Sequence, residues 1–189
     1  MSRPPKVRRS DKQMSSAAVD KMLSTGYCGH IATVGADGAP YVCPLLYVWL
    51  NGQIWLHNTS ARGHLLTNIT HETRACFEIA VPGKVFAYGR YECDTSIEYM
   101  SVIVFGRLSI VEDSTKKALF FDALMAKYYG NDPTRPKSFY PRLDEVTVYS
   151  LTVERVTGKE TILPSVDAQW PAVDNTKSPH AIPPPQRSQ

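Results

Sequence analysis

The amino-acid sequence predicts a mainly β protein, a small closed antiparallel barrel with three helices at its edges. Short segments that favour strands recur along the middle of the chain and are separated by turn residues such as Asn51-Gly52. One long segment, 98–111, contains Gly106, which is typical of a strand that bulges or bends at a barrel corner. The first three strands leave no room for crossover helices, which disfavours a parallel sheet.

The first half of the chain begins with a helix and continues with hairpins. The helix is expected to start at Ser15 or Ser16, which can cap it, and to end at Gly26. Strands follow where apolar and β-branched residues lie between the turn pairs Asp37-Gly38 and Asn51-Gly52. They are expected over residues 28–34, 41–50 and 53–58.

The second half adds two helices and the remaining strands. A short helix is predicted around Leu65, Leu66 and Ile69. A longer helix is expected to open at Asp113 or Ser114 and to run to about Tyr129, because Phe120, Leu124 and Tyr128 share one face. Strands are expected over residues 74–80, 98–111 and 146–156, with a further segment at 84–90 after Pro82-Gly83.

Charge and proline divide the 189 residues into three parts. Residues 1–13 carry a net charge of +4, whereas the remaining 176 residues sum to −1 and the whole chain to +3. We therefore expect residues 1–13 to form a basic flexible tail. Residues 163–189 hold six of the 14 prolines and are expected to form an extended arm. The compact domain is therefore predicted over residues 14–162. Its near-neutral charge argues against a nucleic-acid partner.

The chain is expected to be a cytoplasmic protein without a membrane partner. It has no apolar stretch long enough for a membrane span and no segment that resembles a signal peptide. Cysteines at positions 28, 43, 76 and 93 lack C-x-x-C spacing, so neither a disulfide framework nor a cysteine zinc site is expected. The histidines lack metal-ligand spacing as well, and no metal site is predicted.

Residues 57–64 form the segment with the clearest pattern of a ligand-binding site, a candidate phosphate site. The third predicted strand delivers the chain to a polar and cationic run, and a helix starts within that run. Free N–H groups at a helix start attract anions, hydroxyl groups can add donors, and an arginine fork suits phosphate. A serine- and threonine-rich helix start can also serve for capping alone. The polar and cationic side chains are those of His57, Asn58, Thr59, Ser60, Arg62 and His64.

Four segments in order resemble the pyridoxamine 5'-phosphate oxidase-like FMN-binding split barrels, and within them the nitroimidazole-resistance branch. Asp37-Gly38-Ala39-Pro40-Tyr41-Val42-Cys43-Pro44-Leu45 is similar to that family's D-G-x-P-Y-x-x-P-L pattern. The other segments are Arg8–Thr33, Ile54–Glu78, and Cys93 to Gly106 with Thr157-Gly158-Lys159. Together they cover residues 8–160. The resemblance implies a six-stranded antiparallel barrel of Greek-key type.

The resemblance also implies where a flavin binds. In that family FMN lies at the interface of a homodimer, with backbone atoms of one strand facing its ring and a strand-to-helix junction holding its phosphate. The residues that match the ring-facing strand are Val42, Cys43, Pro44 and Leu45. Those that match the phosphate junction are His57, Asn58, Thr59, Ser60, Arg62, Gly63, His64 and Leu65, and Ser101 approaches from the partner subunit.

The junction departs from the family pattern. The family has a small residue where this chain has Thr59, and a lysine where it has His64. Histidine carries less charge than lysine at neutral pH, so Arg62 is expected to be the main fixed cation.

The implied function is an FMN-dependent oxidoreductase that reduces a small planar acceptor, for example a nitroaromatic. His57 is the candidate catalytic residue, because it could donate a proton or hydrogen bond to the acceptor. The alternative is that His57 only helps to position the phosphate. NAD(P)H is the candidate electron donor, binding without a domain of its own since no G-x-G-x-x-G follows a strand. A flavin store, sensor or electron carrier, a haem protein with His57 or His64 as axial ligand, and a deazaflavin protein remain alternatives.

Overall fold

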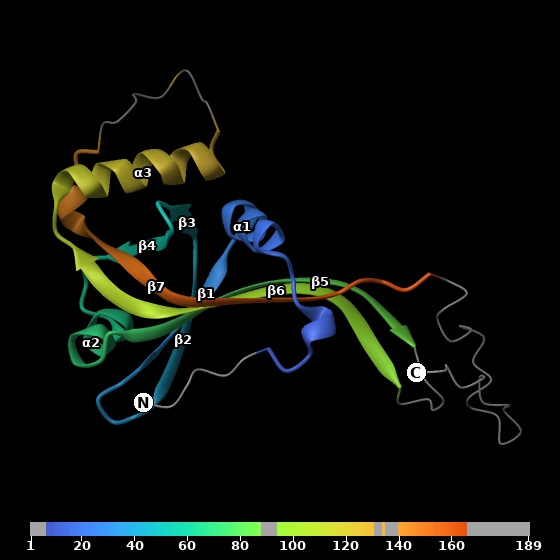
Figure 1. Cartoon of the computed structure of the whole chain (residues 1–189). Helices are drawn as coiled ribbons and strands as arrows, with labels where there is room; N and C mark the ends of the chain where they lie inside the picture. The colour runs from blue at the N-terminus through green and yellow to red at the C-terminus, as the bar shows by residue number, and fades with distance from the viewer. Residues whose placement is uncertain (1–6, 88–93, 131–133, 135–139, 166–189) are drawn as a thin grey trace, which may run out of the picture. The chain divides into compact units, whose positions relative to one another are not determined.

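The structure is a computed structural model, and it describes residues 7–87, 94–130, 134 and 140–165. These residues contain three α-helices, two short 3-10 helices and seven strands of one sheet (Figure 1). The helices are η1 (Ser10–Lys12), α1 (Ser16–Thr25), α2 (His64–His71), α3 (Ser114–Tyr128) and η2 (Leu143–Glu145). The strands are β1 (Gly29–Val34), β2 (Pro40–Leu45), β3 (Tyr47–Leu50), β4 (Gln53–Thr59), β5 (Arg74–Ala87), β6 (Thr95–Val111) and β7 (Val146–Thr161). The predicted mainly β fold is confirmed, but the sheet has seven strands among the described residues and not the six that the resemblance implied.

The order of the strands explains why the sheet closes on itself. Neighbours in the sheet follow the order β2-β1-β5-β6-β7-β4-β3. The two outermost strands, β2 and β3, are consecutive in the chain and only Leu46 separates them. The two ends of the sheet therefore meet at Leu46, and the sheet curls into a barrel.

Contacts group the chain into two compact units. The smaller comprises Met1–Met14, Ala80–Ser101 and Gly158–Gln189, and the larger comprises Ser15–Ile79 and Val102–Thr157. In the smaller unit the end of the predicted basic tail lies along β7: Met14 N donates to Gly158 O over 3.1 Å, and Lys12 Nζ donates to Thr161 Oγ1 over 2.9 Å. The predicted boundaries of the central domain stay a prediction.

Aromatic and aliphatic side chains fill the interior of the larger unit. Ile31 of β1 is fully buried and faces Phe77 of β5, also fully buried, across the sheet. The ring of Tyr47 lies 4.8 Å from that of Phe77, and its hydroxyl donates to Leu23 O of α1 over 2.8 Å. A second cluster lies between α3 and the outer side of the sheet and contains Val48, Trp55, Val111, Phe120, Leu124 and Val148.

Two strand boundaries differ from those predicted. The single strand expected over 41–50 is divided at Leu46 into β2 and β3. It divides there because the backbone N–H of Tyr47 donates to Tyr128 Oη of α3, over 3.2 Å, at the point where the chain leaves one end of the sheet for the other.

Residues 74–80 and 84–87 of the two expected segments form one strand, β5, that continues through Pro82-Gly83 to Ala87. Residues 88–90 of the second segment lie outside the described residues. The Glu98 side chain occupies the space beside Gly83, and its carboxylate accepts from Lys84 N over 3.3 Å. This packing keeps the strand extended where the sequence indicated a turn.

Gly106 allows β6 and β7 to approach closely. A Cβ atom at this buried position would lie 2.0 Å from the backbone oxygen of Thr152. The strand β6 nevertheless runs unbroken through this glycine. The sequence predicted a bulge or a corner at this position, which stays a prediction, and the close approach of two backbones is a separate reason for a glycine here.

Gly106→Ala is therefore expected to lower the free energy of unfolding by about 2–3 kcal/mol, because the backbone of β7 must move to admit the methyl group. Urea unfolding of the full chain measures the change. Gly63→Ala is the matched control, since a Cβ there would meet no atom within 4 Å. Equal stability of the two variants would contradict the close approach.

Candidate functional site

The strand β4 sends its side chains to two different environments. Leu56 is fully buried opposite Tyr149 of β7, and on the same side Asn58 Oδ1 accepts from the Tyr149 hydroxyl over 2.9 Å. Trp55 and His57 alternate with these residues and lie against α3. The strand therefore enters the predicted phosphate junction with its orientation fixed by buried contacts on both sides.

His57 lies among aromatic rings. Its ring centroid is 5.5 Å from that of Phe120 and 5.2 Å from that of Phe121, both on α3. Burial lowers the pKa of His57, because the charged form loses its hydration. Its Nδ1 is buried and has no hydrogen-bond partner among the described residues. The uncharged imidazole is therefore the favoured form at neutral pH.

The junction after β4 is held in place through its backbone. Ser60 N donates to Glu145 O of η2 over 3.0 Å. Gly63 is the N-cap of α2 and offers no side chain to the first free N–H groups of this helix. Arg62 is exposed and, in the part of the chain that the structure describes, forms no ion pair. A cation and free backbone donors thus lie together at this helix start.

The structure brings part of the junction to the predicted ring-facing strand. The His64 ring stacks on Tyr41 of β2, with the centroids 5.3 Å apart and the planes at 20°. In β2, Val42 and Pro44 are exposed whereas Cys43 and Leu45 are half-buried. The segments that were predicted to bind the two ends of one flavin are therefore neighbours, although they are far apart in the sequence.

Other predicted residues lie in different surroundings. Leu65 is buried in α2, so only its backbone is available to a ligand. His57 lies under α3, whereas His64 lies against β2. Ser101 belongs to the smaller unit of the chain. Its predicted approach from a partner subunit stays a prediction.

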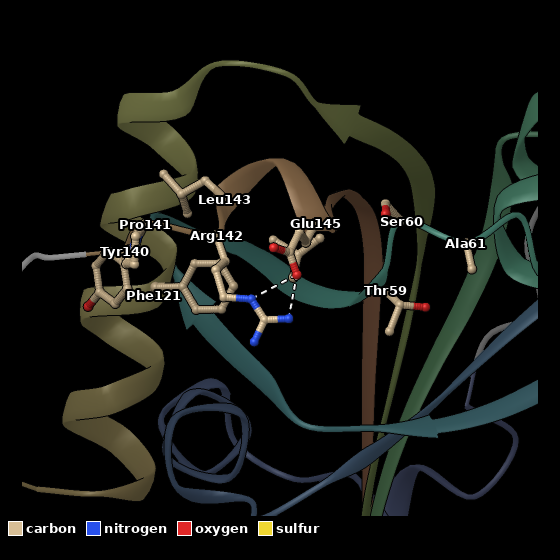
Figure 2. A pocket seen from close by; sticks show the side chains of 10 residues that line it. Thr59, Ser60, Ala61, Phe121, Tyr140, Pro141, Arg142, Leu143 and Glu145 are labelled. Atoms are coloured by element: carbon tan, nitrogen blue, oxygen red, sulfur yellow. Dashed lines mark hydrogen bonds and ion pairs between the residues drawn. The ribbon is translucent and has the colours of Figure 1, made fainter.

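A hollow of about 630 Å³ opens beside the junction (Figure 2). Thr59, Ser60 and Ala61 form one wall, and the other walls come from α3 and from the segment before β7. The residues that sequence reasoning missed are Phe121, Tyr140, Pro141, Arg142, Leu143, Glu145 and Val146. No local pattern singles them out, because they reach the junction only through tertiary contacts such as the Ser60–Glu145 hydrogen bond.

Comparison with known proteins identifies the family. The family model described as pyridoxamine 5'-phosphate oxidase matches residues 15–160. The chain belongs to this family. The split-barrel fold predicted from the sequence motifs is thereby confirmed. No curated protein matches the sequence.

Solved structures of low sequence identity share the fold of this pyridoxamine 5'-phosphate oxidase family member. The flavocytochrome Anf3 from Azotobacter vinelandii superposes with a TM-score of 0.72 at 18% identity, covering 97% of this chain and 85% of the other. The FAD and haem binding protein from Mycobacterium smegmatis gives 0.69 at 21% identity, covering 82% and 77%. A protein from Bacteroides thetaiotaomicron, provisionally assigned to 5-nitroimidazole antibiotic resistance, gives 0.65 at 20% identity, covering 77% and 83%.

The described residues lack two kinds of feature. None of their helices has the length and apolar character needed to cross a membrane. Nor do they contain a group of three or more histidine, cysteine or acidic side chains that could hold a metal ion.

The depressed pKa of His57 predicts a specific pH dependence of stability. The unfolded chain takes up a proton at His57 near the ordinary value of about 6.5, whereas the folded chain does so only at lower pH. The unfolded state therefore binds more protons in that interval, and the free energy of unfolding falls as the pH falls.

His57→Phe removes this contribution and keeps an aromatic ring between Phe120 and Phe121. Its free energy of unfolding should fall less than that of the wild type between about pH 7 and about pH 5. Urea unfolding at both pH values measures the difference, and His71→Gln at an exposed position controls for the loss of a histidine. Parallel pH curves for wild type and His57→Phe would contradict the burial argument.

Proposed function

We propose that this protein is an FMN-binding oxidoreductase that works as a homodimer. The proposal rests on the observation that Arg62 has no carboxylate partner among the described residues. Four other arginines, Arg9, Arg74, Arg107 and Arg142, are each paired with a carboxylate. Arg62 has no such partner among the described residues and lies exposed beside the uncapped start of α2. An unpaired arginine next to free N–H groups suits a phosphate.

The surroundings of Arg62 fit the rest of a flavin phosphate site. Thr59 and Ser60 are exposed and can donate hydroxyl hydrogen bonds. His64, stacked on Tyr41, links the junction to the strand Val42–Leu45, whose backbone is proposed to face the flavin ring. A bound flavin would supply the electron chemistry, and these residues would supply binding and orientation.

The homodimer is proposed because the outer side of β1 and β2 is exposed and carries apolar side chains beside the His30–Glu78 pair. Val34 is 42% exposed and Val42 is 58% exposed, and the register places Val42 opposite Ala32. Pro40 and Pro44 lie two residues before and two residues after Val42, and therefore on the same side of β2. A second copy that covers this face would shield a flat ring system from water, with Ser101 contributed by the partner.

The proposed reaction is the reduction of a small planar acceptor, and a nitroimidazole or another nitroaromatic is the favoured class. Support comes from the name of the Bacteroides thetaiotaomicron protein that shares the fold. His57, uncharged because of its burial, would donate a hydrogen bond to an acceptor oxygen, and NAD(P)H is the proposed electron donor.

A haem-binding function is the second candidate. It is favoured by the names of two proteins that share the fold, a flavocytochrome and an FAD and haem binding protein. The absorbance spectrum of the purified protein separates the candidates. Two bands typical of oxidised flavin support the proposal, whereas an intense Soret band supports haem. A deazaflavin gives a spectrum distinct from both.

A flavin spectrum that neither NAD(P)H nor a nitroaromatic acceptor changes would favour the carrier or sensor alternative. The chromophore released by heat and identified by mass spectrometry establishes which flavin is bound. Sedimentation of the yellow protein tests the homodimer, and a monomer that retains flavin would overturn the interface site.

Arg62→Ala is expected to weaken FMN binding by about 1.5–3 kcal/mol, or about 10- to 150-fold, because a charge-assisted contact to phosphate is lost. Titration of the apoprotein with FMN, followed by quenching of flavin fluorescence, measures the dissociation constant. Arg74→Ala is the matched control, since Arg74 is exposed and paired with Glu72. An unchanged affinity in Arg62→Ala would assign the phosphate to other residues.

A further inference from the structure

Two buried nitrogen atoms beneath α3 lack hydrogen-bond partners. They are Nε1 of Trp55 and Nδ1 of His57, and no group among the described residues forms a hydrogen bond with either atom. Trp55 is only 7% exposed, and His57 is buried enough to lower the pKa of its imidazole. A buried polar atom without a partner is costly. Both atoms therefore require a partner that the described chain does not supply.

The two atoms belong to side chains on the same side of β4. Trp55 and His57 are two residues apart in this strand, which lies beneath α3 (Figure 1). Their ring centroids lie 6.4 Å and 5.5 Å from the centroid of the Phe120 ring. Residues on one side of a strand are about 6.6 Å apart, and a water that forms two hydrogen bonds of about 2.9 Å spans about 5.8 Å. The spacing is therefore suited to one enclosed water between the two rings.

The two nitrogen atoms differ in the hydrogen bonds they can form. The indole N–H of Trp55 only donates, whereas Nδ1 of a neutral histidine accepts when the ring proton is on Nε2. A shared water then accepts from Trp55 and donates to His57, and both atoms have a partner. With the ring proton on Nδ1, two N–H dipoles would point at the same water and repel one another. Both hydrogens of that water would still need acceptors.

We propose that the neutral imidazole of His57 carries its proton on Nε2, and that Trp55 is the positioning residue that fixes this tautomer through one enclosed water. The Trp55 N–H donates to the water, and the water donates to His57 Nδ1. His57 Nε2 is not one of the enclosed atoms without a partner, so its N–H can donate to a ligand. This inference rests on the proposed function, since it names the nitrogen through which His57 donates to the acceptor oxygen.

The same arrangement makes His57 a poor axial ligand for haem. A histidine that binds iron through Nε2 carries its proton on Nδ1 and donates it to a second group, commonly a carboxylate or a carbonyl. His57 Nδ1 has no such acceptor among the described residues, and the Trp55 N–H competes for the lone pairs of any water there. Of the two histidines considered for the haem alternative, His64 is therefore the better candidate.

Nuclear magnetic resonance of the full chain, labelled with ¹⁵N in its histidine rings, tests the tautomer. The chemical shift of each ring nitrogen reports whether that atom carries a proton. Spectra at about pH 8 observe the neutral ring, since the ordinary pKa is about 6.5. The His57 signals are those that His57→Phe lacks. We expect one tautomer with the proton on Nε2, whereas exposed His71 shows an average of both tautomers.

Protonation of His57 on Nδ1, or an average of tautomers like that of His71, would overturn the inference. A low-spin haem complex whose axial histidine is lost in His57→Phe would overturn it as well.

Trp55→Phe tests the role of the indole N–H, because it keeps an aromatic ring against Phe120 and removes the donor. The His57 ring should then show a mixture of tautomers, and both of its nitrogen shifts should move toward those of His71. Trp49→Phe is the matched control: Trp49 lies on β3 opposite Ile54 and is not one of the residues with an unpartnered buried nitrogen. An unchanged His57 spectrum in folded Trp55→Phe would overturn the positioning role.

A measurement on the wild-type protein keeps the test independent of whether Trp55→Phe folds. Magnetisation transfer from water to the indole N–H of Trp55 detects an enclosed water. We expect a cross-peak to a long-lived water together with slow exchange of the indole hydrogen with solvent. Absence of that cross-peak would overturn the water bridge.

These spectra separate the inference from the proposed function, because they require neither flavin nor an acceptor. An Nε2–H tautomer that depends on Trp55, in a protein that neither binds flavin nor reduces an acceptor, would support the assigned tautomer and overturn the proposed function. A mixed tautomer in an active flavoprotein would overturn the inference and leave the proposed function in place.

Discussion

The larger unit of the protein depends on how Tyr47 is held at the point where the two ends of the sheet meet. This residue follows Leu46, the single residue between the outermost strands, and its side chain is fully buried. Its ring contacts Phe77 of β5, its hydroxyl donates to α1, and its backbone N–H donates to Tyr128 of α3. Lys127 Nζ donates to Tyr47 O over 3.1 Å and lies 3.7 Å from the centroid of the Tyr47 ring. Burial of the Lys127 ammonium group lowers its pKa to about 8. One residue therefore joins barrel closure to the position of two helices.

The position of α3 in turn shapes the surroundings of the candidate site. Phe120 and Phe121 lie against His57, and Phe121 also forms a wall of the hollow. On the other side of the junction α2 is anchored to β1, where buried Asn68 Nδ2 donates to Thr33 Oγ1 over 3.0 Å. The exposed junction between β4 and α2 is thus a short loop between two rigid attachments, which is a favourable place for ligand-binding residues.

Two arginines near this junction illustrate how pairing alters chemistry. Arg62 is unpaired in the described structure and carries its full charge toward solvent, which suits an anion such as a phosphate. Arg142 is paired with Glu145, and its charge is therefore neutralised locally. The sequence could predict a role for Arg62, because it lies next to hydroxyl residues at a helix start. It gave no comparable signal for Arg142, whose partner and aromatic neighbours are set by folding.

Local sequence was sufficient for the helices, for most strands and for the family, because turn pairs, capping residues and ordered motifs all act over a few residues. It was insufficient at Leu46 and at Pro82-Gly83, where contacts with Tyr128 and Glu98 decide the outcome. The amino-acid sequence by itself determined the fold class and the candidate phosphate junction. Only the tertiary structure decided which residues from η2 and α3 surround that junction, since those contacts join segments about eighty residues apart and follow from barrel closure.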